Sequence, residues 1–149
     1  MTSRHGLEIR AATAADAAGM ASLLAAHGHP VTPTDLAERL AAFRGGNAAA
    51  LLAVQWGPPS GLLVMGWSPT LAAARPVALV STLLVAADDR RQGIGRLLIK
   101  AAAQAARVAG CGDMMIAAGA NAPSLQEFCR ATGFAETGAH FIRSLRKQA

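Results

Sequence analysis

The chain has 149 residues, 52% of them hydrophobic, which suits one domain over residues 1–149 that buries a core without disulfide bonds. Its formal charge of +5 is uneven, since residues 1–74 carry four basic and four acidic residues and residues 75–149 carry ten and five. No basic run alternates with aromatic residues, the longest apolar run is too short for a membrane span, and the first residues lack the apolar stretch of a secretory signal, so we expect a cytoplasmic protein with neither nucleic acid nor membrane as partner.

The first half of the chain predicts a strand, two helices and a hairpin. Ala17, Met20 and Leu23 recur at helical spacing, and Gly28 closes that segment. The stretch "GPPSG" between two apolar runs is typical of a tight turn between antiparallel strands. We expect a strand at 7–13, helices at 14–28 and 32–43, and strands at 47–56 and 61–67.

The second half alternates strands and helices. The run "VALVSTLLVAA" shows no clean alternation, which favours a central strand buried on both faces. Apolar residues from Ile94 to Val108 recur three and four apart, and Gly110 ends that helix. We expect strands at 77–87, 113–118 and 136–145, and a helix at 122–132. The order βααβββαβαβ predicts an α/β fold with a mixed, mostly antiparallel sheet flanked by helices.

The segment "DDRRQGIGRLL", residues 88–98, has an unusual composition for the start of a helix. Helix starts usually carry a polar cap and acidic residues in the first turn. This one instead has three arginines, at positions 90, 91 and 96, around Gly93 and Gly95. Free N–H groups at a helix start, a flexible backbone and added positive charge are typical of a site for phosphate.

Two common phosphate-binding patterns do not fit this segment. The nucleoside-triphosphate loop needs a Lys followed by Ser or Thr, and the dinucleotide loop needs a third Gly where Leu98 stands. A third pattern, [R/Q]-x-x-G-x-[G/A], is met by Arg90, Gly93 and Gly95, after a buried strand and before an amphipathic helix.

With this pattern and the later "EFCRATGF", the chain resembles the GNAT superfamily of N-acetyltransferases over nearly its whole length. The resemblance implies acetyl-coenzyme A as the acetyl donor, direct transfer to an amine without a covalent enzyme intermediate, and the possibility of a homodimer. It also implies that the strand backbone binds the pantetheine arm and the loop binds the pyrophosphate. The implied binding residues are Leu83, Leu84, Val85, Arg90, Arg91, Gln92, Gly93, Ile94, Gly95 and Arg96.

The catalytic residues of the family match less well. Where the family often has a Tyr that protonates the departing thiolate, this chain has Cys129, and the sequence contains no Tyr. Cys129 is a candidate proton donor, and the alternative is a small buried apolar residue. Asn121 lies one position away from the family's usual Asn, and Ser124 competes with it for a coenzyme contact.

The general base is not marked by a motif. The strand 77–87 offers no Asp or Glu, so His140 is the first candidate, with Glu136, His27 and His29 as alternatives. The cysteines and histidines show no metal-ligand spacing, so we expect no metal.

These features predict an acetyl-coenzyme A–dependent N-acetyltransferase for a primary amine of a small molecule, peptide or protein. The alternative is a module that binds acyl-coenzyme A without catalysis. Residues 27–35 and 66–76 are expected to choose the acceptor, and they carry too few charges to favour a polycation.

Overall fold

The computed structural model describes residues 6–90, 92–118, 123–138 and 141–146. They form two compact units, one within residues 1–115 and one within residues 116–149. The strands are β1 (Glu8–Ala11), β2 (Ala48–Val54), β3 (Gly61–Ser68), β4 (Val77–Val85) and β5 (Asp113–Ile116). The helices are α1 (Ala17–Ala26), α2 (Pro33–Ala41), α3 (Ile94–Val108) and α4 (Pro123–Ala131), with single 3-10 turns η1 (Ala14–Asp16) and η2 (Ala87–Asp89).

The sheet has the order β1-β2-β3-β4-β5. Strands β1 to β4 pair antiparallel with their neighbours in sequence, so the predicted hairpin between β2 and β3 is confirmed. Helix α3 connects β4 to β5, and the result is a mixed α/β sheet, as the sequence predicts.

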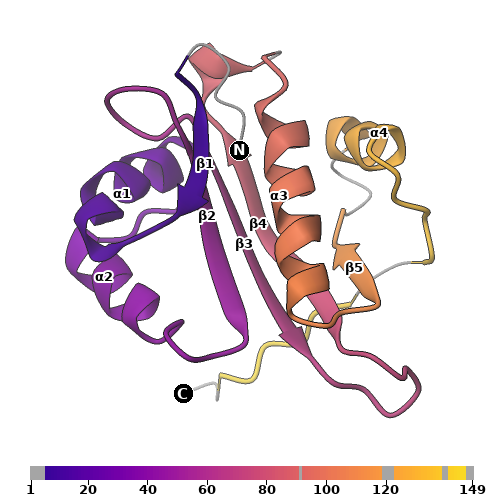
Figure 1. Ribbon diagram of the computed structural model, residues 1–149. Helices are drawn as coiled ribbons and strands as arrows, with labels where there is room; N and C mark the ends of the chain where they lie inside the picture. The colour runs from indigo at the N-terminus through magenta and orange to yellow at the C-terminus, as the bar shows by residue number, and fades with distance from the viewer. Residues whose placement is uncertain (1–5, 91, 119–122, 139–140, 147–149) are drawn as a thin grey trace. The chain divides into compact units, whose positions relative to one another are not determined.

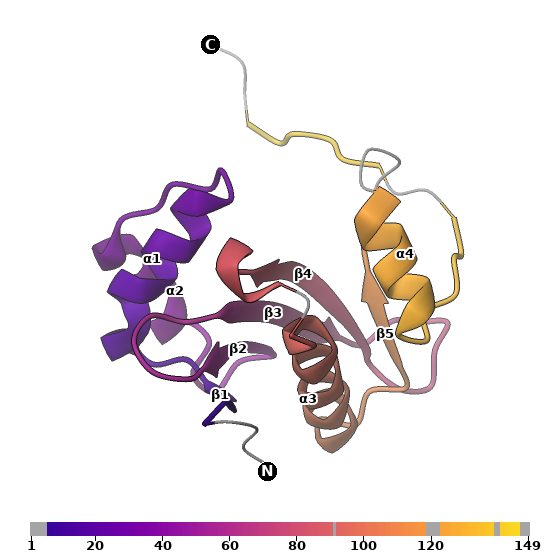
Figure 2. The ribbon, with the colours of Figure 1, turned by 90° about the horizontal axis from the view of Figure 1, so that it is seen from above.

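Within the first unit, helices lie on both faces of the sheet (Figures 1 and 2). Helices α1 and α2 cover one face, where Met20, Leu23 and Leu36 form a buried cluster with Leu52 and Leu62. Helix α3 covers the other face, and its Leu98 is fully buried.

Strand β4 differs from the prediction that it is buried on both faces. Its first half alternates, because Ala78 and Val80 are buried whereas Leu79 and Ser81 are exposed. The register explains this alternation. Ala78 and Val80 share the face that α3 covers, whereas Leu79 lies on the opposite face, where it lines an open pocket.

The predicted last strand, residues 136–145, is not a strand in its described part, which leaves out residues 139 and 140. Phe141, Ile142 and Leu145 are between 87% and 93% exposed. An apolar pattern can indicate a strand, but it cannot supply the neighbouring strand whose hydrogen bonds make one. In the described residues, this segment has no such neighbour.

Helix α4 belongs to the second unit and ends as "EFCRATGF" predicts. Gly133 has a φ of +95° after the last turn, and the N–H of Phe134 donates to the carbonyl oxygen of Cys129 at 2.9 Å. This is a typical glycine-terminated helix end.

Candidate active site

The passage from β4 to α3 builds the loop that the sequence singles out. Helix α3 begins after Gly93, whose φ of +78° lies in the left-handed region that favours glycine. The N–H of Leu97 donates to the carbonyl oxygen of Gly93 at 3.1 Å. Gly93 has no side chain to cap the helix, and the first turn has no acidic residue. The N–H groups of Ile94 and Gly95 therefore have no acceptor within their own helix.

The predicted loop residues divide into exposed and buried ones. Arg90, Gln92, Gly93 and Arg96 are exposed, whereas only 1% of Ile94 is exposed. Ile94 can thus offer only its backbone to a ligand. Arg91 lies outside the described residues.

Ile94 fixes the start of α3 against the sheet. It packs on Gly61, where an added Cβ would lie 2.9 Å from both Ile94 Cγ2 and Leu98 Cδ1. Real Cβ contacts are longer than this, so the close approach of helix and strand requires glycine at position 61. The position of the loop therefore depends on Gly61, which lies 33 positions before Ile94 in the sequence.

His27, which follows α1, contacts the other side of the loop. Its Nδ1 lies 2.9 Å from the carbonyl oxygen of Leu23, and its Nε2 lies 3.2 Å from that of Val85. A guanidinium nitrogen of Arg90 lies 3.4 Å from the same Nε2. Carbonyl oxygens only accept hydrogen bonds, so a doubly protonated ring can donate to both and a neutral ring to one. His27 thus joins α1, the end of β4 and the basic loop.

Strand β4 carries a bulge in its middle. Val64 pairs with Thr82 and Met65 pairs with Val80, so Ser81 is an extra residue on β4. The Ser81 hydroxyl donates to the carbonyl oxygen of Val64 at 3.4 Å. A bulge leaves the backbone groups of its extra residue out of the regular ladder.

Beyond the bulge, β4 runs on toward the loop for longer than β5 does. The N–H of Gly112 donates to the carbonyl oxygen of Pro76 at 3.0 Å, so the two strands begin side by side. β5 has four residues and β4 has nine. The half of β4 that holds Leu83, Leu84 and Val85 therefore extends past the end of β5 as a strand. All three residues are half-buried.

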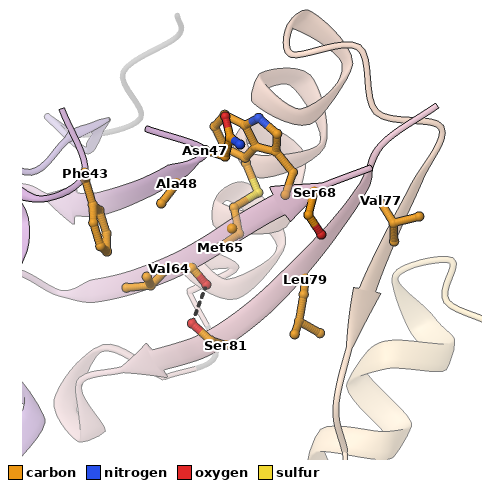
Figure 3. Close-up of a pocket in the computed structure, with 11 residues that line it drawn as sticks. Phe43, Asn47, Ala48, Val64, Met65, Ser68, Val77, Leu79 and Ser81 are labelled. Atoms are coloured by element: carbon orange, nitrogen blue, oxygen red, sulfur yellow. Dashed lines mark hydrogen bonds between the residues drawn. The ribbon is translucent and has the colours of Figure 1, made fainter. Parts of the chain in front are cut away.

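A pocket of about 440 Å³ opens on the sheet face that α1 and α2 partly cover (Figure 3). The side chains of Val64, Leu79 and Ser81 project toward it from β3 and β4. Its walls come from the segment between α2 and β2 and from three strands: Phe43, Asn47, Ala48, Val64, Met65, Gly66, Trp67, Ser68, Val77, Leu79 and Ser81.

Only part of this pocket was predicted from the sequence. Of the two segments expected to choose the acceptor, 66–76 contributes its first residues and 27–35 contributes none among the described lining residues. A second pocket, of about 310 Å³, lies between β1, β2 and α2 and includes no residue of β4.

The second unit holds the predicted proton donor. Cys129 is 7% exposed, and burial raises the pKa of its thiol. A raised pKa keeps the thiol protonated at neutral pH, as both a proton donor and a buried apolar residue would be. The role of Cys129 therefore stays a prediction.

Of the other candidates in the second unit, two are exposed and two lie outside the described residues. Ser124 is exposed in the first turn of α4. Glu136, an alternative base, forms an exposed ion pair with Arg130 at 3.0 Å. Asn121 and the favoured base His140 lie outside the described residues.

Residues 18–134 match the Acetyltransferase (GNAT) family. The chain belongs to this family. It is therefore an acyltransferase, and the prediction made from residues 88–98 and 127–134 is confirmed. No curated protein matches the chain by sequence.

Solved structures share the fold at low sequence identity. An acetyltransferase of Trypanosoma brucei has a TM-score of 0.81 and 19% identity, covering 93% of this chain and 99% of its own. An aminoglycoside acetyltransferase from an uncultured soil metagenomic sample, in complex with sisomicin, has a TM-score of 0.78 and 22% identity over 95% and 97% of the two chains. Glucosamine-6-phosphate N-acetyltransferase of Arabidopsis thaliana has a TM-score of 0.82 and 13% identity over 94% and 99%.

Two absences hold for residues 6–90, 92–118, 123–138 and 141–146. No three of their His, Cys, Asp and Glu side chains gather as a metal site would require. Among these residues, no helix is long and apolar enough to cross a membrane.

Proposed function

We propose that this GNAT protein transfers the acetyl group of acetyl-coenzyme A directly to a primary amine. The observation that carries the proposal is the start of α3, where a left-handed Gly93, an uncapped first turn and exposed arginines occur together at the end of β4. The aminoglycoside and glucosamine-6-phosphate acetyltransferases that share the fold support an amine acceptor.

The loop has the donors that a pyrophosphate needs. An added Cβ on Gly93 would meet no atom of the described residues within 4 Å, so among these residues nothing covers the backbone there. The N–H groups of Ile94 and Gly95, with the positive end of the α3 dipole, would bind the phosphate oxygens. Arg90 and Arg96 would add charge at the rim of the site.

Strand β4 has a free length that suits the pantetheine arm. From Val85 to the bulge at Ser81 is four residues, or roughly 13 Å of strand. Backbone groups of Leu83 to Val85 would pair with the amides of the arm. The thioester would then lie close to the bulge, where an N–H outside the ladder can stabilise negative charge that develops on the thioester oxygen.

Binding and transfer can be tested separately on the full chain. Calorimetry should show one acetyl-coenzyme A per chain. Thiol release, followed with a chromogenic disulfide, should require an added amine, and mass spectrometry should find one acetamide for each thiol released. Thiol release that is independent of the amine would contradict the proposal. Tight binding without turnover on any amine would instead indicate the non-catalytic module.

A further inference from the structure

The wall of the pocket beside the bulge contains no charge. Of the described residues that line it, every one is apolar or neutral, and the polar side chains are those of Asn47, Ser68 and Ser81, together with the ring nitrogen of Trp67. The charged residues on the surrounding elements, none of which lines the pocket, are Asp35, Glu38, Arg39, Arg44 and Arg75.

Carboxylates are missing from a long stretch of the sequence around this pocket. Between Glu38 and Asp88 the chain has no acidic residue, and this stretch includes β2, β3 and β4 entirely. The three strands that form the pocket floor thus offer no carboxylate as a partner for an ammonium group. An ammonium that bound against this floor would exchange part of its water for apolar surface without gaining a counter-ion, which costs free energy.

The surface of the pocket suits a small apolar body. Its volume of about 440 Å³ falls in the range of small-molecule sites. Leu79 keeps 48% of its surface exposed on the pocket floor. Leu71 is fully exposed in the loop that joins β3 to β4. Exposed apolar side chains beside a neutral pocket favour an apolar ligand over a sugar phosphate or a polyamine.

We infer that the acceptor of this site is a weakly basic primary amine on an uncharged, mostly apolar body, and that it binds as the neutral amine. The inference rests on the proposed function, because it names the acceptor class of that transfer. It distinguishes this chain from an enzyme that would recruit cationic acceptors with acidic residues.

The transfer needs no carboxylate when the amine arrives neutral. The nitrogen lone pair attacks the thioester carbonyl carbon, so that a C–N bond forms and the C–S bond breaks. The thiolate leaves with the bonding electron pair, and the proton lost from nitrogen goes to water. The products are the acetamide and, once the thiolate is protonated, coenzyme A thiol.

Two ring amines of similar size test the inference: aniline, which is weakly basic, and cyclohexylamine, which is strongly basic. An alkylamine with a pKa near that of lysine, about 10.4, is almost entirely protonated at neutral pH. Its kcat/KM should therefore rise about tenfold per pH unit between pH 7 and 9. That of aniline should stay level, and this profile also controls for titration of the protein.

Further acceptors and variants distinguish the possible outcomes. Spermidine, glucosamine-6-phosphate and an aminoglycoside should react at least tenfold less efficiently than aniline. A level profile for cyclohexylamine, or a higher kcat/KM for spermidine, would overturn the inference and leave the proposed transfer standing. Loss of the level aniline profile in His140→Gln would also overturn it, because His140 would then be the base. Binding of acetyl-coenzyme A without turnover on any amine would remove the proposed function itself.

Leu79→Asp and Leu79→Asn test whether this pocket is the site. Both changes remove apolar contact, so the KM for aniline should rise about threefold to tenfold in each. At pH 7, cyclohexylammonium should inhibit only the Asp variant more strongly than wild type, because the new carboxylate attracts it. An unchanged KM for aniline in both variants would overturn the inference. So would a dimer that Leu79→Asp dissociates with kcat/KM unchanged, since a second copy would then occupy the pocket.

Discussion

The two ends of β4 present different surfaces. At the end near Val85, a left-handed glycine, helix N–H groups and exposed arginines form a polar, positively charged loop. At the other end, Leu79 and Ser81 line a pocket with neutral side chains from β2, β3 and the segment before β2, and none of its described lining residues is charged. Backbone N–H groups and positive charge would suit a polyanionic donor that is the same in every reaction. Neutral side chains would suit an acceptor that is selected by its shape.

The largest effect on donor binding is expected at Gly93, at the loop end of β4. Gly93→Asp should lower the affinity for acetyl-coenzyme A at least a hundredfold, about 2.7 kcal/mol, because a carboxylate would face the phosphates. Gly93→Asn is the matched control, since Asn and Asp tolerate the left-handed region equally but only Asp adds charge. Calorimetry on both variants checks this. Equal affinities in the two would mean that phosphate does not bind at the start of α3.

The two ends also differ in how far the sequence predicts them. The loop is contiguous, and its pattern of Arg90, Gly93 and Gly95 follows an apolar run and precedes a helical one, so local rules suffice. The fold class follows from the same periodicities. The loop's support from Gly61 could not be predicted, because a glycine in a strand gives no sign of what packs on it.

The pocket could not be predicted because it depends on register. Ser81 is an extra residue only because Val64 and Met65 pair with Thr82 and Val80, and no local feature of "VALVSTLL" indicates this. The contact of His27 with Val85 joins residues 58 positions apart. The exposed Leu79 was predicted as core because apolar composition does not say which face another element covers.

Gly61 should show how far the loop end of β4 depends on the packing of α3 against β3. Gly61→Ala should destabilise the fold by about 1–3 kcal/mol, because its Cβ would lie 2.9 Å from Ile94 and Leu98. It should also weaken acetyl-coenzyme A binding, because Ile94 begins the helix. Gly66→Ala is the control on the same strand, where the nearest atom would lie 3.4 Å away. Chemical denaturation and calorimetry measure the two effects, and equal destabilisation by both variants would contradict this packing argument.

Salt should affect donor binding at the charged loop more than acceptor binding at the uncharged pocket. The affinity for acetyl-coenzyme A should fall as ionic strength rises, whereas the KM for an uncharged acceptor should stay constant. Arg96→Gln should weaken donor binding about threefold to tenfold and reduce its dependence on salt. Arg107→Gln, at the far end of the same helix, should change neither. A salt response that Arg96→Gln leaves intact would mean that Arg96 does not contribute to binding the phosphates.

The smallest expected effect belongs to His27, which contacts the donor end of β4 without facing the predicted phosphate site directly. His27→Ala removes the contacts to Val85 and Arg90. Nε2 makes only one of them a hydrogen bond at a time, because it donates to the Val85 carbonyl oxygen when protonated and accepts from Arg90 when not, so the loss is about 1 kcal/mol. Because these contacts hold the end of the strand and the loop in place, the affinity for acetyl-coenzyme A should fall about threefold to fivefold. The KM for the acceptor should stay within twofold, since His27 does not line the pocket.

His27→Gln, whose amide can still donate to the Val85 carbonyl oxygen, should recover part of the loss. His29→Ala, two residues on and exposed, is the control for the loss of an imidazole nearby. If kcat of His27→Ala decreases as the pH is lowered while the donor affinity stays unchanged, His27 would instead be the general base. A loss confined to donor binding would establish it as a positioning residue for β4 and the loop.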